Sequence, residues 1–440
     1  MSARKQATPT IPQATGVTVA SPRPAPNVIR RFWNSLGPGV ITGAADDDPS
    51  GIATYSIAGA QFGNGFLFAA LLTWPLMAAV QSMCARIGMV TGTGLMAALK
   101  EKFPRPVLAT ACFALLAANT INIGADLAGM ADAAELLSGI SSHLWVSVFA
   151  VLIGWATVQM RYAAVAAVLK WLALVLFAYV ITAFKVGPPW SVVLHDTFLP
   201  TLPHNREALA TLVAILGTTI SPYLFFWQAS QEVEEEKALG RHTLVARRGA
   251  TDEDIKRRKI DVGVGTFFSN LAMFFIILTT ALTLHRAGLT NLETSRDVAK
   301  ALEPLAGRFA TLLYTVGLLG VGTLAIPTLA GSAAYAFAEL FGWRQGIDEH
   351  FRGAPAFYAV ILLSLAAGVI MDFTNVNAVR ALYWTAVLNG LLAPFLLVGI
   401  LIAASDRTLM QGQPSSALGR VVVGITTVAM FAAGIGMFVV

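Results

Sequence analysis

Three consecutive carboxylates, Asp46, Asp47 and Asp48, stand in the middle of an apolar stretch, and Pro49 and Gly51 follow them closely. A charge at membrane depth is costly unless it is paired or wetted. Proline removes a backbone donor and glycine permits a sharp bend, so we expect the helix to stop near Asp47 and restart near Gly51. The carbonyls freed by this break, together with a carboxylate, would form a hard-oxygen site for a cation. A simple kink at a wet interface is the alternative, but the flanks of the break are too short to span a bilayer separately.

A second interruption is expected in a later apolar stretch, where Thr218, Thr219 and Ser221 precede Pro222. For this stretch alone, a proline kink with hydroxyls bonded back to the helix would be a sufficient explanation. The two interruptions, however, fall in the first and sixth apolar segments. Five segments is the spacing of an inverted repeat whose broken helices meet at the substrate site. We therefore predict that the two breaks face each other across a water-accessible pocket.

Further polar groups could line a path to this site. Asp46 and Asp47 could attract cations as an outer ring, and Asp126 in the third apolar segment is another acid at membrane depth. Asp126 could pass a cation or a proton onward, or it could pair with a polar face of a neighbouring helix, and both interpretations stay open. The six histidines fall in loops or at segment ends, so a histidine proton relay is not expected. The candidate metal ligands are oxygens from both breaks: the Asp48 carboxylate, carbonyls near Asp47 and Thr218, and the hydroxyls of Thr219 and Ser221.

The composition around these groups is that of a membrane protein. Of the 440 residues, 56% are hydrophobic and 12% are charged, whereas a soluble domain has about 25% charged residues. No soluble shape of this length hides so much apolar surface, so lipid must face most of it. Segments that approach the roughly 20 residues needed to cross a bilayer occur at about 36–62, 66–90, 107–134, 143–160, 163–185, 207–235, 261–285, 309–338, 355–372, 377–403 and 419–439.

The remaining features predict topology and exclude other classes of protein. Residues 1–32 are rich in Pro, Thr, Ala and Ser, which predicts a disordered cytoplasmic tail and no cleaved signal peptide. Most Lys and Arg residues fall in connections that lie on the same side of the membrane as the N-terminus. We therefore predict a multi-pass protein of the inner (plasma) membrane, with its N-terminus in the cytoplasm and its C-terminus outside. This clustering argues against a nucleic-acid partner. Cys84 and Cys112 lie in apolar runs and are expected to be core side chains. No nucleotide-binding, hydrolase or cofactor motif occurs.

The two breaks and the order of the segments resemble the Nramp family of divalent metal transporters. The likeness rests on a Gly-Pro-Gly that leads to Asp48-Pro49, on the break at Pro222, and on the Asp-Leu-Ala that begins at Asp126. It covers nearly the whole chain from about residue 33. The resemblance implies an all-α polytopic fold of the LeuT type, with a tail (1–32), a transporter domain (33–440), two five-helix inverted repeats (about 36–185 and 207–403) and an eleventh transmembrane helix (419–439).

The chain departs from the family pattern at both breaks. The family's Asn ligand after the first break is Gly51 here, and its Met-Pro-His in the sixth segment is Ser221-Pro222-Tyr223. The position of the family's carbonyl donor is Thr218. Losing the thioether removes a donor that favours soft or borderline ions such as Mn²⁺, Fe²⁺ and Cd²⁺. Mg²⁺ prefers oxygen and often keeps several waters, so a roomier oxygen site would suit it.

Two more departures bear on the path and on coupling. The family's Glu in the third segment is Gly129, and its Gln in the tenth segment is Ala386, with Asn389 one turn away. Losing the Glu and the sixth-segment His implies transport without proton coupling. The pattern is similar to the Nramp-related magnesium transporter branch.

Three hypotheses follow from these residues. The first is a carrier that moves Mg²⁺, and also admits Mn²⁺, by alternating access without proton coupling. The second is a proton-coupled Mn²⁺ or Fe²⁺ symporter. The third, from another class, is a membrane-embedded enzyme that holds Mg²⁺ with the three aspartates, but the chain lacks the further acidic and basic cluster such enzymes bring. A channel is a weaker variant, because two broken helices without a repeated pore loop favour alternating access. The sequence does not indicate the oligomeric state.

Overall fold

A computed structural model describes residues 38–160, 174–203, 205–373 and 377–440. The contacts divide the chain into Met1–Ser35 and Leu36–Val440, and the predicted tail 1–32 lies outside the described residues. The described part consists of helices and their connections, and nine of its helices are long and apolar enough to cross a membrane. The fold is therefore a bundle of helices that could face lipid, as the composition predicts.

The first predicted interruption is present. Helix α2 (Pro38–Asp46) ends at the aspartate run, and α3 (Pro49–Phe62) begins two residues earlier than expected at Gly51. Asp48 causes this early start, because its extended backbone and its carboxylate make it the N-cap of α3, and proline suits the first helical position. Gly51 therefore lies in the first turn of α3 and is not the point where the helix restarts.

The second predicted interruption is also present. Helix α11 (Arg206–Thr219) and helix α12 (Pro222–Ala238) are separated by Ile220 and Ser221. Ser221 has the extended backbone of an N-cap, and Pro222 occupies the first helical position. The same local chemistry, a polar cap followed by proline, thus starts the second half of both broken spans.

Helices occupy the remaining predicted spans as well. For the fifth span (163–185), residues 161–173 lie outside the described part, and the rest forms a 3₁₀ turn and α9. The seventh begins nine residues early, because Thr251 and Asp254 form a capping box ahead of a polar first turn. The spanning helices are α4 (Leu67–Thr91), α6 (Arg105–Ser138), α7 (Ser142–Gln159), α9 (Phe177–Val186), α14 (Asp252–Thr280), α17 (Ala310–Phe341), α18 (Pro355–Asp372), α19 (Ala378–Ser405) and α20 (Ala417–Val439).

Short elements connect these helices. Most of them lie between the spans predicted from the apolar runs, but Leu174–Leu176 and Ala281–His285 fall within the fifth and seventh predicted spans. They are η1 (Gly63–Phe66), α5 (Leu95–Lys100), η2 (Leu174–Leu176), α10 (Trp190–Phe198), α13 (Leu244–Arg247), the π-helical η3 (Ala281–His285), α15 (Ser295–Ala299), η4 (Lys300–Leu302), α16 (Glu303–Ala306) and η5 (Gly307–Phe309).

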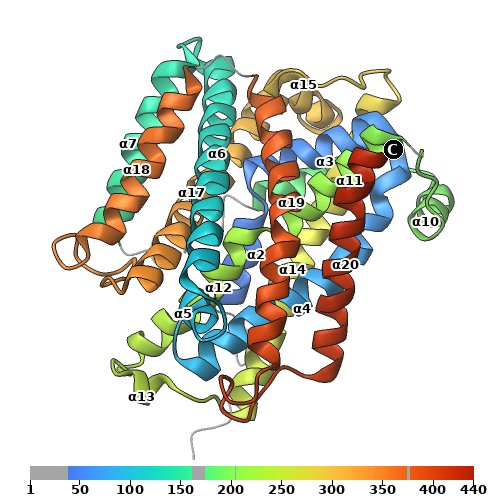
Figure 1. The fold of residues 1–440 in the computed structure, drawn as a ribbon. Coiled ribbons are helices and arrows are strands. Elements are labelled where there is room, and N and C mark those ends of the chain that lie inside the picture. The colour runs from blue at the N-terminus through green and yellow to red at the C-terminus, as the bar shows by residue number, and fades with distance from the viewer. Residues whose placement is uncertain (1–37, 161–173, 204, 374–376) are drawn as a thin grey trace, which may run out of the picture. The chain divides into compact units, whose positions relative to one another are not determined.

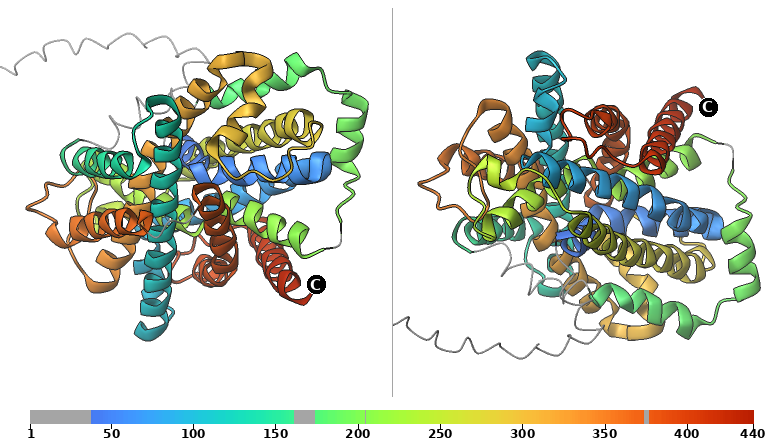
Figure 2. Two further views of the ribbon diagram at one scale, coloured as in Figure 1. Left: turned by 90° about the horizontal axis from the view of Figure 1, so that it is seen from above. Right: turned by 90° about the horizontal axis from the view of Figure 1, so that it is seen from below.

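The packing of the helices repeats after five spans. Helix α12 packs on α4, and α2 packs on α14; likewise α6 packs on α7, and α17 packs on α18. The first two contacts join span six to span two and span one to span seven, and the last two join span three to span four and span eight to span nine. Each contact therefore has a counterpart in which both spans are replaced by the spans five places away. Figure 1 shows α7 and α18 side by side, with α6 and α17 next to them, and Figure 2 shows α3 alongside α14. This is the arrangement expected of two five-helix repeats.

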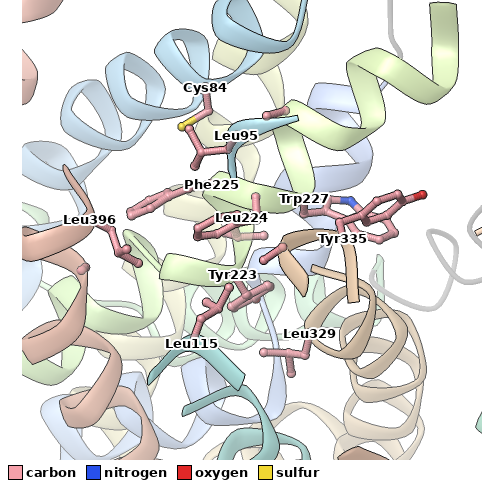
Figure 3. Close-up of a cluster of buried hydrophobic side chains, with 14 of the residues drawn as sticks. Cys84, Leu95, Leu115, Tyr223, Leu224, Phe225, Trp227, Leu329, Tyr335 and Leu396 are labelled. Atoms are coloured by element: carbon pink, nitrogen blue, oxygen red, sulfur yellow. The ribbon is translucent and has the colours of Figure 1, made fainter. Parts of the chain in front are cut away.

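Helix α12 lies at the centre of the largest apolar cluster. Figure 3 shows Tyr223, Leu224, Phe225 and Trp227 of α12 surrounded by side chains from neighbouring helices. The Trp227 ring contacts Tyr335 of α17 in an edge-on arrangement, with their centroids 6.3 Å apart. The second broken span is therefore held by large side chains on several sides, which fixes the position of the break at its start.

Candidate functional site

Asp48 is the acid at the centre of the first break. Its Oδ1 accepts hydrogen bonds from Ser50 Oγ at 2.6 Å and from the Gly51 backbone N–H at 2.7 Å. Its Oδ2 accepts from Asn122 Nδ2 at 3.2 Å. The side chain is 1% exposed, so the carboxylate is closed off from bulk solvent and held in one orientation by three donors.

Thr218 of the second break faces Asp48. A Cβ added at Gly51 would lie 3.1 Å from Thr218 Oγ1 and 3.5 Å from Asp48 Oδ1, so both oxygens flank the same spot. The glycine lets the two broken spans approach this closely. The two breaks therefore converge as predicted. The site is buried and closed, however, where a water-accessible pocket was expected.

The other two hydroxyls of the second break are bonded to the helix. Ser221 Oγ donates to the carbonyls of Gly217 and Thr218, each at 2.7 Å. Thr219 Oγ1 donates to the Ile215 carbonyl at 2.7 Å and lies 3.3 Å from the Tyr55 hydroxyl. A hydroxyl that donates its proton still has lone pairs, so both oxygens keep the capacity to bind a cation.

Asp46 and Asp47 are buried against α14. Ser269 Oγ lies 2.6 Å from Asp46 Oδ2 and 3.1 Å from Asp47 Oδ1, and the two acids are 0% and 6% exposed. They therefore do not form an exposed ring. Ser269 was not among the sequence candidates, because nothing in the local pattern of α14 indicates that it would meet residues 222 positions away.

Asp126 joins the site through an amide. Asn122 Nδ2 donates to Asp126 Oδ2 at 3.0 Å as well as to Asp48, and Asn389 Nδ2 donates to Asn122 Oδ1 at 3.3 Å. The structure thus brings the predicted Asp48, Asp126 and Asn389 together through Asn122, which the sequence analysis missed. The sequence could have indicated Asn122, because it lies one helical turn before Asp126 and therefore on the same face of the helix.

Tyr223 ties the second break to the first. Its hydroxyl donates to the Ala45 carbonyl at 2.9 Å, so one of the last carbonyls of α2 is occupied by a phenol from α12. This contact lies beside the aspartate run and closes the two broken spans onto each other.

The donor chemistry of the site consists of one central carboxylate and neutral oxygens. No group of three or more His, Cys, Asp or Glu side chains is placed to hold a metal ion within the described ranges. The enzyme hypothesis needed Asp46, Asp47 and Asp48 to hold Mg²⁺ jointly. Instead, the first two share Ser269 while Asp48 bonds to Asn122, so that hypothesis gains no support.

Comparisons with known proteins show relatives and structural neighbours of this chain. Divalent metal cation transporter MntH of Caldanaerobacter subterraneus subsp. tengcongensis is 26% identical over 412 residues, covering 89% of this chain and 90% of the relative. The crystal structure of the Eremococcus coleocola manganese transporter, in complex with an aromatic bis-isothiourea substituted compound, has a TM-score of 0.76 at 16% identity and covers 95% of this chain and 88% of its own. Mhp1, a nucleobase-cation-symport-1 family transporter, has a TM-score of 0.56 at 14% identity, with 91% and 90% covered.

The two structural likenesses confirm the predicted all-α, LeuT-type fold. Nine described helices are long and apolar enough to cross a membrane, and α20 occupies the predicted eleventh span. The family model described as Nramp, natural resistance-associated macrophage protein-like, matches residues 39–440, which include both breaks and every helix of the site. By that match, the chain belongs to the Nramp family.

Proposed function

We propose that this protein carries a divalent metal cation across the membrane by alternating access, with Mg²⁺ as its cargo and Mn²⁺ also admitted. The observation that carries the proposal is the buried Asp48 carboxylate, which lies at one helix break and faces the oxygens of a second break. Relatives named divalent metal cation transporters support the class of cargo. The choice of Mg²⁺ rests on this chain's own donors.

The proposed ligands are hard oxygens. Asp48 supplies the charge, and the Thr218 hydroxyl lies opposite it across Gly51. The Thr218 carbonyl, which accepts from Ser221 Oγ, is a further proposed ligand. The hydroxyls of Ser221 and Thr219 bind directly or through retained water, and the Asp47 carbonyl lies at the end of α2. Mg²⁺ gives up its waters reluctantly and takes few protein ligands. A set of one carboxylate and several neutral oxygens matches that preference better than it matches a soft ion.

Transport without proton coupling is the second part of the proposal. Tyr223 donates its hydroxyl proton to a carbonyl, and a phenol, unlike a histidine, does not change its charge near neutral pH. Gly129 packs against Leu382 and offers no side chain that could carry a proton. The cation's own gradient and the membrane potential then drive uptake.

A proton-coupled Mn²⁺ or Fe²⁺ symporter remains the second candidate, and one contact favours it. Thr219 Oγ1 lies 4.0 Å from Met273 Sδ of α14, so a thioether sits behind one of the proposed hydroxyl ligands. Strong Cd²⁺ uptake with acidification of the vesicle interior would select this candidate over the first.

The deciding experiment is uptake into proteoliposomes with Mg²⁺, Mn²⁺ and Cd²⁺ in parallel, together with a dye that reports internal pH. We expect Mg²⁺ uptake without acidification. Asp48→Ala should abolish uptake of every ion, because it removes the one charge of the donor set, while the protein still reaches the membrane and purifies as the wild type does.

A matched control removes a carboxylate outside the site. Asp406 lies just beyond α19 and pairs with Lys102, and the hydrogen bond from Lys102 holds the pKa of Asp406 below its usual range. Asp406→Asn should transport normally. Undiminished uptake by Asp48→Ala would reject the assigned site, and equal loss in both variants would point to a general defect.

A further inference from the structure

Asn122 of α6 occupies the space between two buried carboxylates. Its Nδ2 donates to Asp48 Oδ2 at 3.2 Å and to Asp126 Oδ2 at 3.0 Å, and all three side chains are buried. Only the NH₂ group of an amide can donate, so two carboxylate acceptors fix which way this amide faces. Asn122 therefore presents hydrogens to Asp48, the acid that we assign to the cation.

Asn389 of α19 holds the other end of that amide. Its Nδ2 donates to Asn122 Oδ1 at 3.3 Å. Its own Oδ1 is buried and has no hydrogen-bond partner in the part of the chain that the structure describes. Leaving a buried amide oxygen without a hydrogen-bond donor costs free energy. Asn389 Oδ1 is such an acceptor.

The helices that carry these groups pack tightly around them. Ala53 of α3, Ala125 of α6 and Leu382 of α19 form a small apolar cluster beside the amides. Backbone movement is therefore restricted here, whereas an amide turned by half a rotation needs almost no extra room, because its oxygen and nitrogen are nearly the same size.

Building on the proposed function, we propose that Asn122 is a ligand of the transported divalent cation and that it turns its amide oxygen toward Asp48 when the cation arrives. A cation on Asp48 repels the N–H groups that now face it and attracts Oδ1. The turned Asn122 then directs Nδ2 toward Asn389, where a second half-rotation brings the unpartnered Oδ1 into position to accept it. Asn389 Oδ1, which has no donor in the described structure, would then accept from Asn122, and Asn389 Nδ2 would take the place that Oδ1 leaves.

This switch has two consequences for the cation. It supplies an amide oxygen from α6 to the first break. In the family pattern an Asn ligand follows that break, and this chain has Gly51 at that position. The switch also releases Asp126 from its bond to Asn122, so a second carboxylate becomes free to attract the cation from the α6 side. Asn122 would therefore affect both the affinity of the site and the rate at which the cation leaves it.

The test compares Asn122→Leu, Asn122→Asp and Asn389→Leu with a control on the same helix. Asn119 is also fully buried on α6, but its amide donates to the Leu329 carbonyl and to Ser332 Oγ of α17, each at 2.9 Å. Asn119→Leu therefore matches the loss of a buried amide without touching the two carboxylates. The full-length variants are compared in proteoliposome uptake of Mg²⁺ and Mn²⁺, in calorimetric titration of the purified protein with MgCl₂, and in thermal unfolding.

We expect Asn122→Leu to raise the Mg²⁺ KM and Kd by roughly tenfold or more, in the range typical of residues that support a metal site. Asn389→Leu should have a smaller effect in the same direction. Asn122→Asp adds a charge, so KM should fall while Vmax also falls because release is slower. Asn119→Leu should keep the wild-type KM and Kd, even if it unfolds at a lower temperature.

The outcomes separate this inference from the proposed function. If the wild type moves and binds no divalent cation, the proposed function fails and this inference fails with it. If the wild type transports and Asp48→Ala does not, but Asn122→Leu and Asn119→Leu have the same KM and Kd, only the role given to Asn122 is overturned. A fall in Vmax alone, at unchanged Kd, would also overturn it, because that is what a purely structural residue produces.

Discussion

At the residue scale, we expect Ser221 to influence which cation the proposed site accepts. Its hydroxyl lies at the start of α12 and bonds to the carbonyls of Gly217 and Thr218. This bonding draws the oxygen toward the end of α11 and keeps the second break compact. A longer side chain that cannot donate a hydrogen bond would lose both of these bonds.

Ser221→Met should shift the preference of the site toward softer ions. A thioether favours Cd²⁺ and Mn²⁺ over Mg²⁺, and the variant also frees the Thr218 carbonyl. We expect the Cd²⁺/Mg²⁺ uptake ratio to rise by roughly tenfold, which corresponds to about 1.4 kcal/mol. Competition uptake in proteoliposomes measures this ratio, with Ser221→Ala as the control that loses the hydroxyl without gaining sulfur. A ratio that stays the same in both variants would count against the softness argument.

At the scale of elements, the contact between α2 and α14 keeps one side of the site closed. Asp261 Oδ2 accepts the Gly39 backbone N–H at 2.8 Å, which caps the first turn of α2. Arg258 donates to this same oxygen at 2.6 Å and to Glu232 of α12 at 2.8 Å. One arginine thus connects α14 with α12 and, through Asp261, with α2, so these elements must separate together if this side opens.

Gly43→Ala should loosen the α2–α14 contact. A Cβ at Gly43 would lie 2.5 Å from the backbone of Gly265, which cannot move aside as a flexible side chain could. We expect a loss of about 1–3 kcal/mol of stability, typical of overpacking, seen as a lower unfolding temperature of the purified protein. The control is Gly263→Ala on α14, where an added Cβ meets nothing within 4 Å; there the helix should gain up to about 1 kcal/mol. Equal melting temperatures for the two variants would show that α2 is not held by this close approach.

The elements were more predictable from the sequence than the contacts between them. Apolar runs and prolines gave the spans and both breaks, because each depends on a local stretch of chain. The start of α3 at Pro49 was missed by two residues, since the capping role of Asp48 was not recognised. Asn122 and Ser269 were missed because their partners lie 74 and over 200 positions away along the chain, and such pairings arise only from packing. The orientation of the Ser221 hydroxyl was not predicted either, because its bonds to the Gly217 and Thr218 carbonyls depend on how the chain folds at the break.

At the scale of the whole molecule, the repeat predicts how the chain crosses the membrane. Helix α14 lies between the connection that contains Val245 and the connection that contains Leu289, and we expect it to cross the membrane once. Four further spanning helices, α17, α18, α19 and α20, follow before the C-terminus. Val245 and Leu289 should therefore lie on opposite sides of the membrane, while Leu289 and Val440 should lie on the same side. The positive-inside pattern adds that Val245 is cytoplasmic.

Single cysteines at these three positions test the arrangement, because the chain's own Cys84 and Cys112 are fully buried and should give a quiet background. The three sites are 83%, 38% and 65% exposed, so a maleimide can reach each of them. In intact cells, a membrane-impermeant maleimide should label Leu289→Cys and Val440→Cys, and it should label Val245→Cys only after permeabilisation. The reverse pattern would overturn the orientation but keep the spans. Labelling of Val245→Cys and Leu289→Cys from the same side would show that α14 does not cross the membrane. The five-plus-five arrangement that positions both breaks would then lack one of its spanning helices and would be contradicted.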